Sequence, residues 1–496
     1  MTLQTNISER PPNKISKSLE ADAPAERGDW RLGFASLETE ATVGRELDVV
    51  GTLPPDLQGT LYRIGPARND VYGDRYRHWF DGDGMVHALQ LEGGRVVYKN
   101  RFVATAGKAR EDAARRRIFS TFGSPPAGDM LTRLANRKAK NSANTNIVAH
   151  AGKLRALFEG GRPHAIDPET LATLGEDDMS GELGSSDTYS AHPKLDPATG
   201  AMWNFGVGFG RRAMVRLYCT RPDGTTTRAA EFALPFGAFV HDFAITETKA
   251  VFVVPPLTLA AVPFALLLGQ HSFADGLRWR PELGTRIAVV DRASGEVRWH
   301  RTDALMLFHT IQAWEEAGDI VVDLCAYPDD TVMRSFREVM RQVSVPTPAP
   351  AWPERLGLRG DGTVTRTRLS KTSLEFPRTA GRAPAGGYTR VYGVSWSEGV
   401  EFLGVPTAID VKTGRAEVAP RAPGELSGEC VPVMKAGATS EREAWLLAIV
   451  LDAVRGVSEL RILDAGDLAA PPVARVALPY VMPFGFHGNW LRRAAV

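Results

Sequence analysis

The sequence has 496 residues, of which 43% are hydrophobic and 24% charged, and its formal net charge is +1. This composition is typical of a folded globular protein, and the length predicts either two to four domains or one large repetitive fold. A net charge near zero, without a run of five or more basic residues, excludes the electrostatic footprint of a nucleic-acid-binding protein.

The N-terminal residues 1–28 are polar and contain no apolar segment of the kind found in secretory signals. We expect them to form a disordered or loosely attached arm in front of a single domain at 29–496.

The three cysteines are too few and too scattered for a disulfide framework, which favours a reducing compartment. We therefore expect a cytoplasmic protein.

From Gly51 onward, short segments rich in β-branched and aromatic residues alternate with turns that contain aspartate, proline and glycine. The strongest predicted strands are 95–104, 153–160, 201–209, 249–255, 285–291, 319–327, 389–397 and 444–452. Helical patterns are scarce, and the best are 109–117, 257–269 and 331–343. The proline-rich segment 344–353 predicts a long surface loop. Many hairpins in one unbroken chain indicate an all-β fold closed by radial repetition, a β-propeller, with a pair of sandwiches as the alternative.

Among the apolar segments of the sequence, 257–269, LTLAAVPFALLLG, comes closest to a membrane-spanning helix. Its thirteen residues are fewer than the roughly 18 of a membrane-spanning helix. Composition alone therefore leaves two interpretations, a buried core helix or a segment that lies at a membrane surface.

Four of the ten histidines share a context, because each stands at a predicted strand or turn edge beside an aromatic residue or a proline. They are His192, His241, His309 and His487. Taken singly, a histidine is more often a surface or satisfied core residue than a ligand. Their spacing excludes a local zinc motif. They could meet at a metal ion only if a closed fold brings distant blades to one axis, which would explain why His487 lies so near the end of the sequence.

Several segments together resemble the carotenoid cleavage oxygenases. They are FDGDGMVH (80–87), SANTNIV (142–148), LRALFEGGRPHAIDPETL (154–171), the four histidine contexts, LEFPR (374–378) and LPYVMPFGFHGNW (478–490). The resemblance extends from about Arg31 to Trp490. It implies a seven-bladed β-propeller with Fe(II) held on its axis by the four histidines, under a dome of loops and helices.

The resemblance also implies roles for residues around the iron. Three glutamates would accept hydrogen bonds from the ligand imidazoles: Glu159, Glu375 and Glu429, with Glu425 as the alternative to Glu429. Thr145 would crowd one open position at the iron. Phe80, Phe158 and Phe239 would line a substrate tunnel, and core packing is the other interpretation of these three. The apolar run 257–269 would contact the membrane beside the tunnel mouth.

Elementary chemistry is consistent with this site. Four neutral imidazoles suit Fe(II), although they also suit zinc and copper. Nearby carboxylates would fix the tautomers of the imidazoles and balance the charge of the ion. Four ligands on an octahedral ion leave two positions, of which one can take O₂. Zinc would contribute nothing to the activation of O₂, because it is redox-inert.

We therefore expect an Fe(II)-dependent dioxygenase that cleaves a carbon–carbon double bond of a hydrophobic polyene into two carbonyl products. The resemblance is greatest to bacterial enzymes that form retinal by cleaving the central 15,15' bond of an apocarotenal. A stilbene-cleaving enzyme is the nearest alternative, in which Lys138 or Lys140 would hold a phenol, but Lys108 stands where a tyrosine is usual. An isomerohydrolase of retinyl esters and a non-enzymatic binding propeller are the remaining alternatives.

Overall fold

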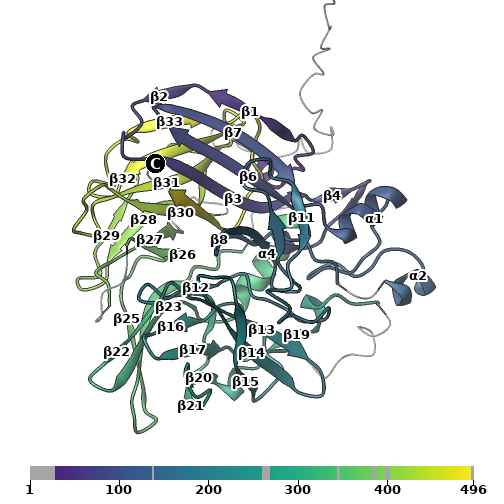
Figure 1. Ribbon diagram of the computed structural model, residues 1–496, viewed down its shortest axis with the longest axis vertical. Helices are drawn as coiled ribbons and strands as arrows, with labels where there is room; N and C mark the ends of the chain where they lie inside the picture. The colour runs from purple at the N-terminus through teal and green to yellow at the C-terminus, as the bar shows by residue number, and fades with distance from the viewer. Residues whose placement is uncertain are drawn as a thin grey trace, which may run out of the picture.

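Seven antiparallel sheets of four or five strands form the body of the computed structural model (Figure 1). The structure describes residues 28–136, 139–259, 269–342, 347–381, 387–396 and 403–492. The seven sheets are the blades of a β-propeller, which confirms the predicted fold class and rules out a pair of sandwiches. Each of the eight segments predicted above as strands overlaps an observed strand.

Five of the blades follow the chain from an inner strand to an outer strand. The first three comprise β8 (Asn146–His150), β9 (Lys153–Leu157), β10 (His164–Ile166) and β11 (Thr173–Glu176); β12 (Lys194–Leu195), β13 (Met202–Phe209), β14 (Ala213–Thr220) and β15 (Thr226–Ala233); and β16 (Ala244–Ile245), β17 (Lys249–Val254), β20 (Thr285–Asp291) and β21 (Val297–Thr302). The next two comprise β22 (Met306–Glu316), β23 (Asp319–Tyr327), β24 (Trp352–Leu358) and β25 (Val364–Arg368); and β26 (Glu375–Thr379), β27 (Arg390–Ser395), β28 (Val405–Asp410) and β29 (Ala416–Val418).

The last two blades combine strands from both ends of the chain, and this closes the ring. One contains β30 (Glu425–Met434), β31 (Ala444–Asp452), β32 (Val457–Asp464), β33 (Ala474–Ala477) and, at its outer edge, β2 (Val49–Gly51). The other contains β34 (Gly488–Arg492), β3 (Gly59–Arg68), β6 (Asp83–Glu92), β7 (Arg95–Phe102) and β1 (Ala41–Leu47). The pairing of β3 with β34 and of β2 with β33 therefore fixes the C-terminal strands next to the N-terminal ones.

The inner strands lie side by side around the propeller axis. Contacts connect β16 with β22, β22 with β26, β26 with β30, β30 with β34, and β34 with β8. Aliphatic side chains fill the spaces between blades. Between the two closing blades, for example, Leu61, Leu89, Leu447, Leu460 and Ile462 form part of one buried cluster. The inner strands, which are far apart in sequence, thereby begin close to one another around a single axis.

The α-helices among the described residues are α1 (Ala106–Ala114), α2 (Met130–Ala135) and α4 (Thr331–Arg341). In the view of Figure 1, α1 and α2 lie beside the blades at the right and α4 lies near the centre. The 3₁₀ helices are η2 (Trp30–Phe34), η3 (Trp79–Asp81), η4 (Ala274–Gly276) and η5 (Pro281–Leu283), and two small sheets pair β4 (Asp70–Val71) with β5 (Asp74–Arg75) and β18 (Leu257–Leu259) with β19 (Leu277–Trp279).

The helix predictions at 109–117 and 331–343 are confirmed to within a few residues, but α2 was not predicted. Thr105 caps α1 by accepting a hydrogen bond from the backbone of Lys108. The apolar face of α4, which includes Val332, Met333, Val339 and Met340, is buried against the blades.

Two sequence-based predictions are wrong in part. The run 257–269 does not begin as a helix, because Leu257–Leu259 pair with β19; residues 260–268 lie outside the described part of the chain. The segment 344–353 is not wholly a surface loop either. Ala351 is 2% exposed, and strand β24 begins at Trp352.

The predicted arm at 1–28 lies outside the described residues except for Gly28. The described chain contains no helix that combines the length and the hydropathy needed to cross a membrane.

Shortening one aliphatic side chain between the closing blades should weaken the whole ring. Leu61 is fully buried in β3. We expect Leu61→Ala to lower the free energy of unfolding by about 2–5 kcal/mol, because it leaves a cavity where the ring closes. The urea midpoint measures this. The control, Val43→Ala in β1, removes a side chain that is 83% exposed and should leave the midpoint almost unchanged. Equal effects of the two changes would contradict this account of closure.

Candidate metal centre

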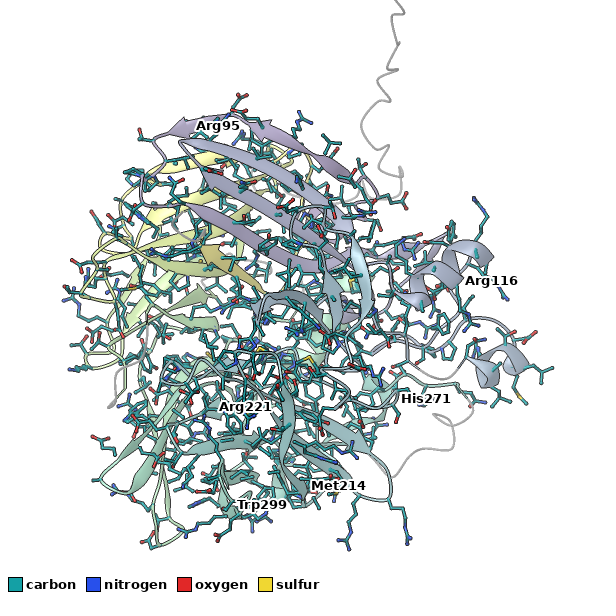
Figure 2. All side chains as sticks on the ribbon, viewed as in Figure 1. Arg95, Arg116, Met214, Arg221, His271 and Trp299 are labelled. Atoms are coloured by element: carbon teal, nitrogen blue, oxygen red, sulfur yellow. The ribbon has the colours of Figure 1, made fainter. Side chains whose placement is uncertain are left out.

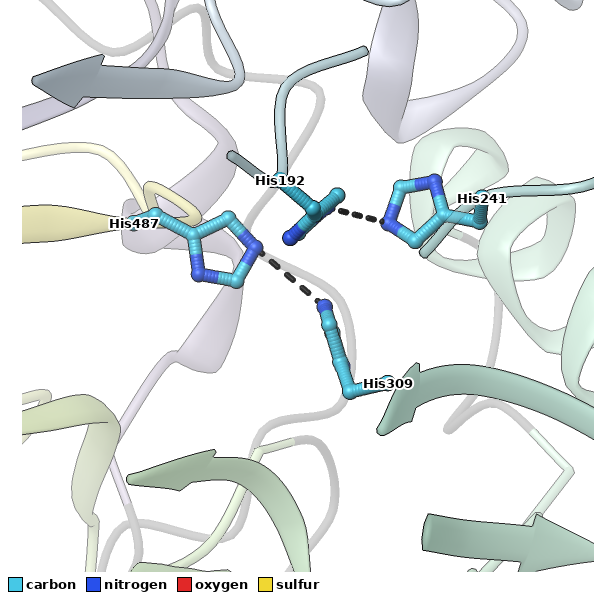
Figure 3. Close-up of side chains that lie close together, drawn as sticks. All are labelled: His192, His241, His309 and His487. Atoms are coloured by element: carbon cyan, nitrogen blue, oxygen red, sulfur yellow. Dashed lines mark hydrogen bonds between the residues drawn. The ribbon is translucent and has the colours of Figure 1, made fainter. Parts of the chain in front are cut away.

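The four predicted histidines meet on the propeller axis (Figure 3). His192, His241 and His487 stand just before the inner strands β12, β16 and β34, and His309 lies near the start of β22. All four side chains are buried, and one nitrogen of each lies within 4.8 Å of the corresponding nitrogens of the other three. The Nε2 atoms of His192 and His241 are 2.9 Å apart, and those of His309 and His487 are 3.2 Å apart.

These separations fit ligands of one metal ion. Two nitrogens that occupy neighbouring positions of an octahedral ion, each bonded at about 2.1 Å, lie about 3.0 Å from one another. Imidazoles whose Nε2 lone pairs faced each other at this distance without a cation would repel. The geometry and the donor set therefore fit a divalent transition metal ion bound by four imidazoles.

Each of three imidazoles donates its Nδ1 proton to a glutamate. His241 donates to Glu159 over 2.8 Å, and His309 donates to Glu375 over 2.5 Å. His487 donates to Glu429 over 2.9 Å. A proton held on Nδ1 leaves the lone pair on Nε2, so these carboxylates select the tautomer that can bind a metal.

Glu425, the alternative to Glu429, does not reach the metal centre. It binds Arg461 of its own blade through both carboxylate oxygens. Among the hydrogen bonds of the described residues, none pairs His192 with a carboxylate.

Further residues hold these glutamates in place, and the sequence-based analysis missed them. Tyr327 donates to Glu375 over 2.9 Å, while Arg63 and Arg378 both bind Glu429. Arg378 belongs to the motif LEFPR, so the motif could have pointed to it. Arg63 lies 366 positions from Glu429 and has no local signal in the sequence.

The backbone at Phe376 is strained beside the metal centre. Its φ angle is +51°, in the left-handed region that residues other than glycine rarely adopt. In this conformation its N–H donates to Glu375 over 2.6 Å, and its ring lies 5.5 Å from the rings of His309 and His487. Such strain is typical of positions that a functional site requires.

Electrostatics at the centre favour a bound cation. Burial, followed by the other three imidazoles, holds the pKa of His192 well below its usual value. Burial also lowers the pKa of His487 to about 4, against the opposing effect of Glu429. Burial raises the pKa of Glu375, but His309 outweighs it, so the pKa of this carboxyl is lowered overall. Burial thus favours the neutral forms of His192 and His487, whereas Glu375 outweighs burial at His309 and raises the pKa of that imidazole.

One apolar cavity opens onto three of the imidazoles, and a second apolar cavity adjoins it. The first, of about 100 Å³, is lined by His241, His309, His487, Thr145 and a group of phenylalanines that includes Phe80 and Phe158. The second, of about 400 Å³, includes Phe239 and His271 in its wall. Both cavities share Phe122, Phe158 and Glu159, so they adjoin one another. His271 lies on the same side of the molecule as helices α1 and α2 (Figure 2).

The three predicted aromatic residues line the cavities, Phe80 and Phe158 the first and Phe158 and Phe239 the second. The rings of Phe80 and Phe239 are nearly parallel to that of His241, at centroid distances of 6.5 and 5.8 Å. Thr145 precedes β8 and donates from its hydroxyl to Asn144 over 3.1 Å. The structure thus brings every predicted site residue except Glu425 to the cavities or to the histidines.

Comparisons with known proteins agree with this arrangement. The family model described as retinal pigment epithelial membrane protein matches residues 34–492. The chain is 34% identical to the apocarotenoid-15,15'-oxygenase of Synechocystis, over 93% of this chain and 96% of the relative. It is 30% identical to an isoeugenol monooxygenase of Pseudomonas nitroreducens, over 90% and 95%.

Solved structures show the same fold. A variant of Synechocystis apocarotenoid oxygenase superimposes with a TM-score of 0.86 at 32% identity, covering 94% of this chain and 98% of that one. The cobalt-substituted form of that enzyme gives a TM-score of 0.85 with the same identity and coverage. The chain is therefore an oxygenase and belongs to the retinal pigment epithelial membrane protein family, that of the carotenoid cleavage oxygenases.

Proposed function

We propose that this chain is an Fe(II)-dependent dioxygenase that cleaves the central 15,15' double bond of an apocarotenal and releases retinal. The observation that carries the proposal is the cluster of four imidazoles, three of which (His241, His309 and His487) face a cavity walled by aromatic side chains. The specificity named for the Synechocystis relative supports the choice of bond.

Charge balance supports a divalent ion. Glu429 is compensated by Arg63 and Arg378. For Glu159 and Glu375, the ion pairs of the described residues give each a single partner, its imidazole. These two carboxylates bring two negative charges close to the four neutral ligands, which matches the charge of Fe(II). Iron rather than zinc fits an oxygenase, since zinc is redox-inert.

The protein positions the reactants and keeps water away from them. Bound Fe(II) supplies the redox chemistry that lets O₂ react with an alkene. The phenylalanines of the two cavities suit a rigid polyene and exclude water from it. Thr145 narrows the space beside the imidazoles, and the three glutamates hold the ligand rings in place. The overall reaction breaks one C=C bond and adds both atoms of O₂, one to each carbonyl product.

The cavities favour a hydrocarbon chain over a phenol. In the stilbene-cleaving alternative, a lysine would hold the phenol, but no described lysine lines either cavity. Lys108 pairs with Asp112 on α1, and Lys140 is buried between Glu111 and Asp83. Lys138 lies outside the described residues.

We place the enzyme in the cytoplasm. Gly269, at the end of the apolar run 257–269, contributes to the wall of the second cavity, which is consistent with a membrane contact near the tunnel mouth. That contact stays a prediction, because residues 260–268 are not described.

Removing one ligand should remove the metal. We expect His309→Ala to purify with little iron and to lose activity, because three imidazoles would remain and Glu375 would lose its partner. Elemental analysis measures the iron. The control is His150→Ala, since His150 contacts the backbone of Gly200 at a distance from the metal centre. Equal iron contents in both variants would refute the four-histidine site.

Two glutamates of strand β30 provide a matched comparison. Glu429→Gln should weaken iron affinity by about 10–100-fold, because it removes the charged acceptor of His487. Glu425→Gln should leave the affinity unchanged, because Glu425 binds Arg461 instead. Titration of the apoprotein against a chelator measures both affinities. The assignment is wrong if the second variant binds iron as weakly as the first.

Isotope labelling tests the reaction itself. After incubation with an apocarotenal under ¹⁸O₂, we expect two aldehydes, retinal among them, each carrying one labelled oxygen. Chromatography with mass spectrometry, on samples quenched quickly enough to limit exchange with water, measures the label. Cleavage of a 4-hydroxystilbene alone would favour the stilbene alternative. Conversion of a retinyl ester to an unlabelled retinol would favour the isomerohydrolase, and no product from any substrate would favour a non-enzymatic propeller.

A further inference from the structure

Three residues that closely follow metal-site histidines meet on the side of the imidazoles away from the aromatic cavities. Lys194 stands two positions after His192, while Asp242 and Thr310 directly follow His241 and His309. They come from three successive blades. Lys194 and Thr310 also line a separate cavity of about 590 Å³ that is walled by the inner strands.

Asp242 is the centre of this contact. Its side chain is buried, and Oδ1 accepts from the Lys194 ammonium over 2.8 Å. Its Oδ2 accepts from the backbone N–H of Thr310 over 2.8 Å and lies 2.8 Å from the Thr310 hydroxyl.

The backbone at His309 depends on this carboxylate. The pairing of β22 with β23 is irregular on both sides of Thr310. A bulge of this kind disturbs the regular ladder and turns a side chain towards a site. The N–H that Asp242 accepts belongs to the peptide bond between His309 and Thr310, so the contact fixes the backbone that carries this imidazole.

His192 has two connections to the same blade as Asp242. The first is the Lys194–Asp242 ion pair. The second passes through Ser190, whose hydroxyl accepts from the backbone N–H of His192 over 3.1 Å and donates to the carbonyl of His241 over 3.3 Å. His192, which has no glutamate partner among the described residues, is therefore held through its backbone.

We infer that Asp242, with Lys194 and Thr310, is a positioning residue that fixes His192, His241 and His309 relative to one another for metal binding. The three glutamates orient individual rings, whereas this contact sets the spacing of the backbones that carry them. The inference rests on the four-imidazole site proposed above.

Thr310→Val is the most direct test, because it keeps the shape of the side chain and removes only the hydroxyl. We expect it to bind Co(II) about 10–100-fold more weakly than the unaltered chain and to change the visible spectrum of the bound ion. Lys194→Met should act in the same direction. Thr310→Ser should restore both the affinity and the spectrum, because it retains the hydroxyl.

The matched control is Lys249→Met. Lys249 forms an ion pair with Asp291 over 2.7 Å within the blade that carries His241, away from the metal centre. This variant should bind Co(II) as the unaltered chain does. Urea midpoints of all the variants separate a loss of stability from a loss of metal affinity.

The inference is overturned if Thr310→Val and Lys194→Met bind Co(II) with unchanged affinity and spectrum, even where the urea midpoint falls, since that result would describe a purely structural contact. If the unaltered chain itself binds no Co(II) or Fe(II), the proposed metal site fails and the inference with it.

Discussion

The structure depends on one constraint, the convergence of four buried imidazoles at the axis of a closed ring. His309 and His487 both direct their Nδ1 protons to glutamates, so their Nε2 lone pairs face each other at 3.2 Å and repel unless a cation lies between them. Only closure of the ring can bring His487 to this point, because β34 is held there by its pairing with β3. The same pairing that stabilises the propeller therefore completes the site.

The surroundings of the imidazoles differ on their two sides. Towards the helices lie phenylalanines, which suit an apolar substrate and exclude water. Towards the opposite side lie charged and hydrogen-bonded groups, in which Asp242 connects three blades. Between them, Glu159, Glu375 and Glu429 fix the tautomers of three rings. A metal ion at this position would be exposed to substrate on one side and held rigidly from the other.

Much of the fold was predictable because its signals are local. Strands such as β23 and β31 appear in the sequence as β-branched and aromatic segments between turns, and α4 appears as an amphipathic pattern. The histidines were predictable from their short contexts and from the family resemblance. The sequence left Glu425 as an alternative to Glu429, and only the contact of Glu429 with His487 in the structure distinguishes the two.

The features that sequence analysis missed arise from long-range contacts. Arg63 reaches Glu429 from the opposite end of the chain, and the partner of Thr310 lies 68 positions away. Neither contact produces a periodic pattern in the sequence from which it could be recognised. Leu257–Leu259 were assigned to a helix on composition, but a partner strand, β19, determines their structure. The burial of Ala351 likewise depends on neighbours that a proline-rich composition does not reveal.

Anomalous diffraction at the iron absorption edge, from crystals of protein purified without air, tests the central claim most directly. The account predicts one iron peak at bonding distance from the Nε2 atoms of His192, His241, His309 and His487. No peak at that point after reconstitution with ferrous ion, or a peak bound by other residues, would contradict it.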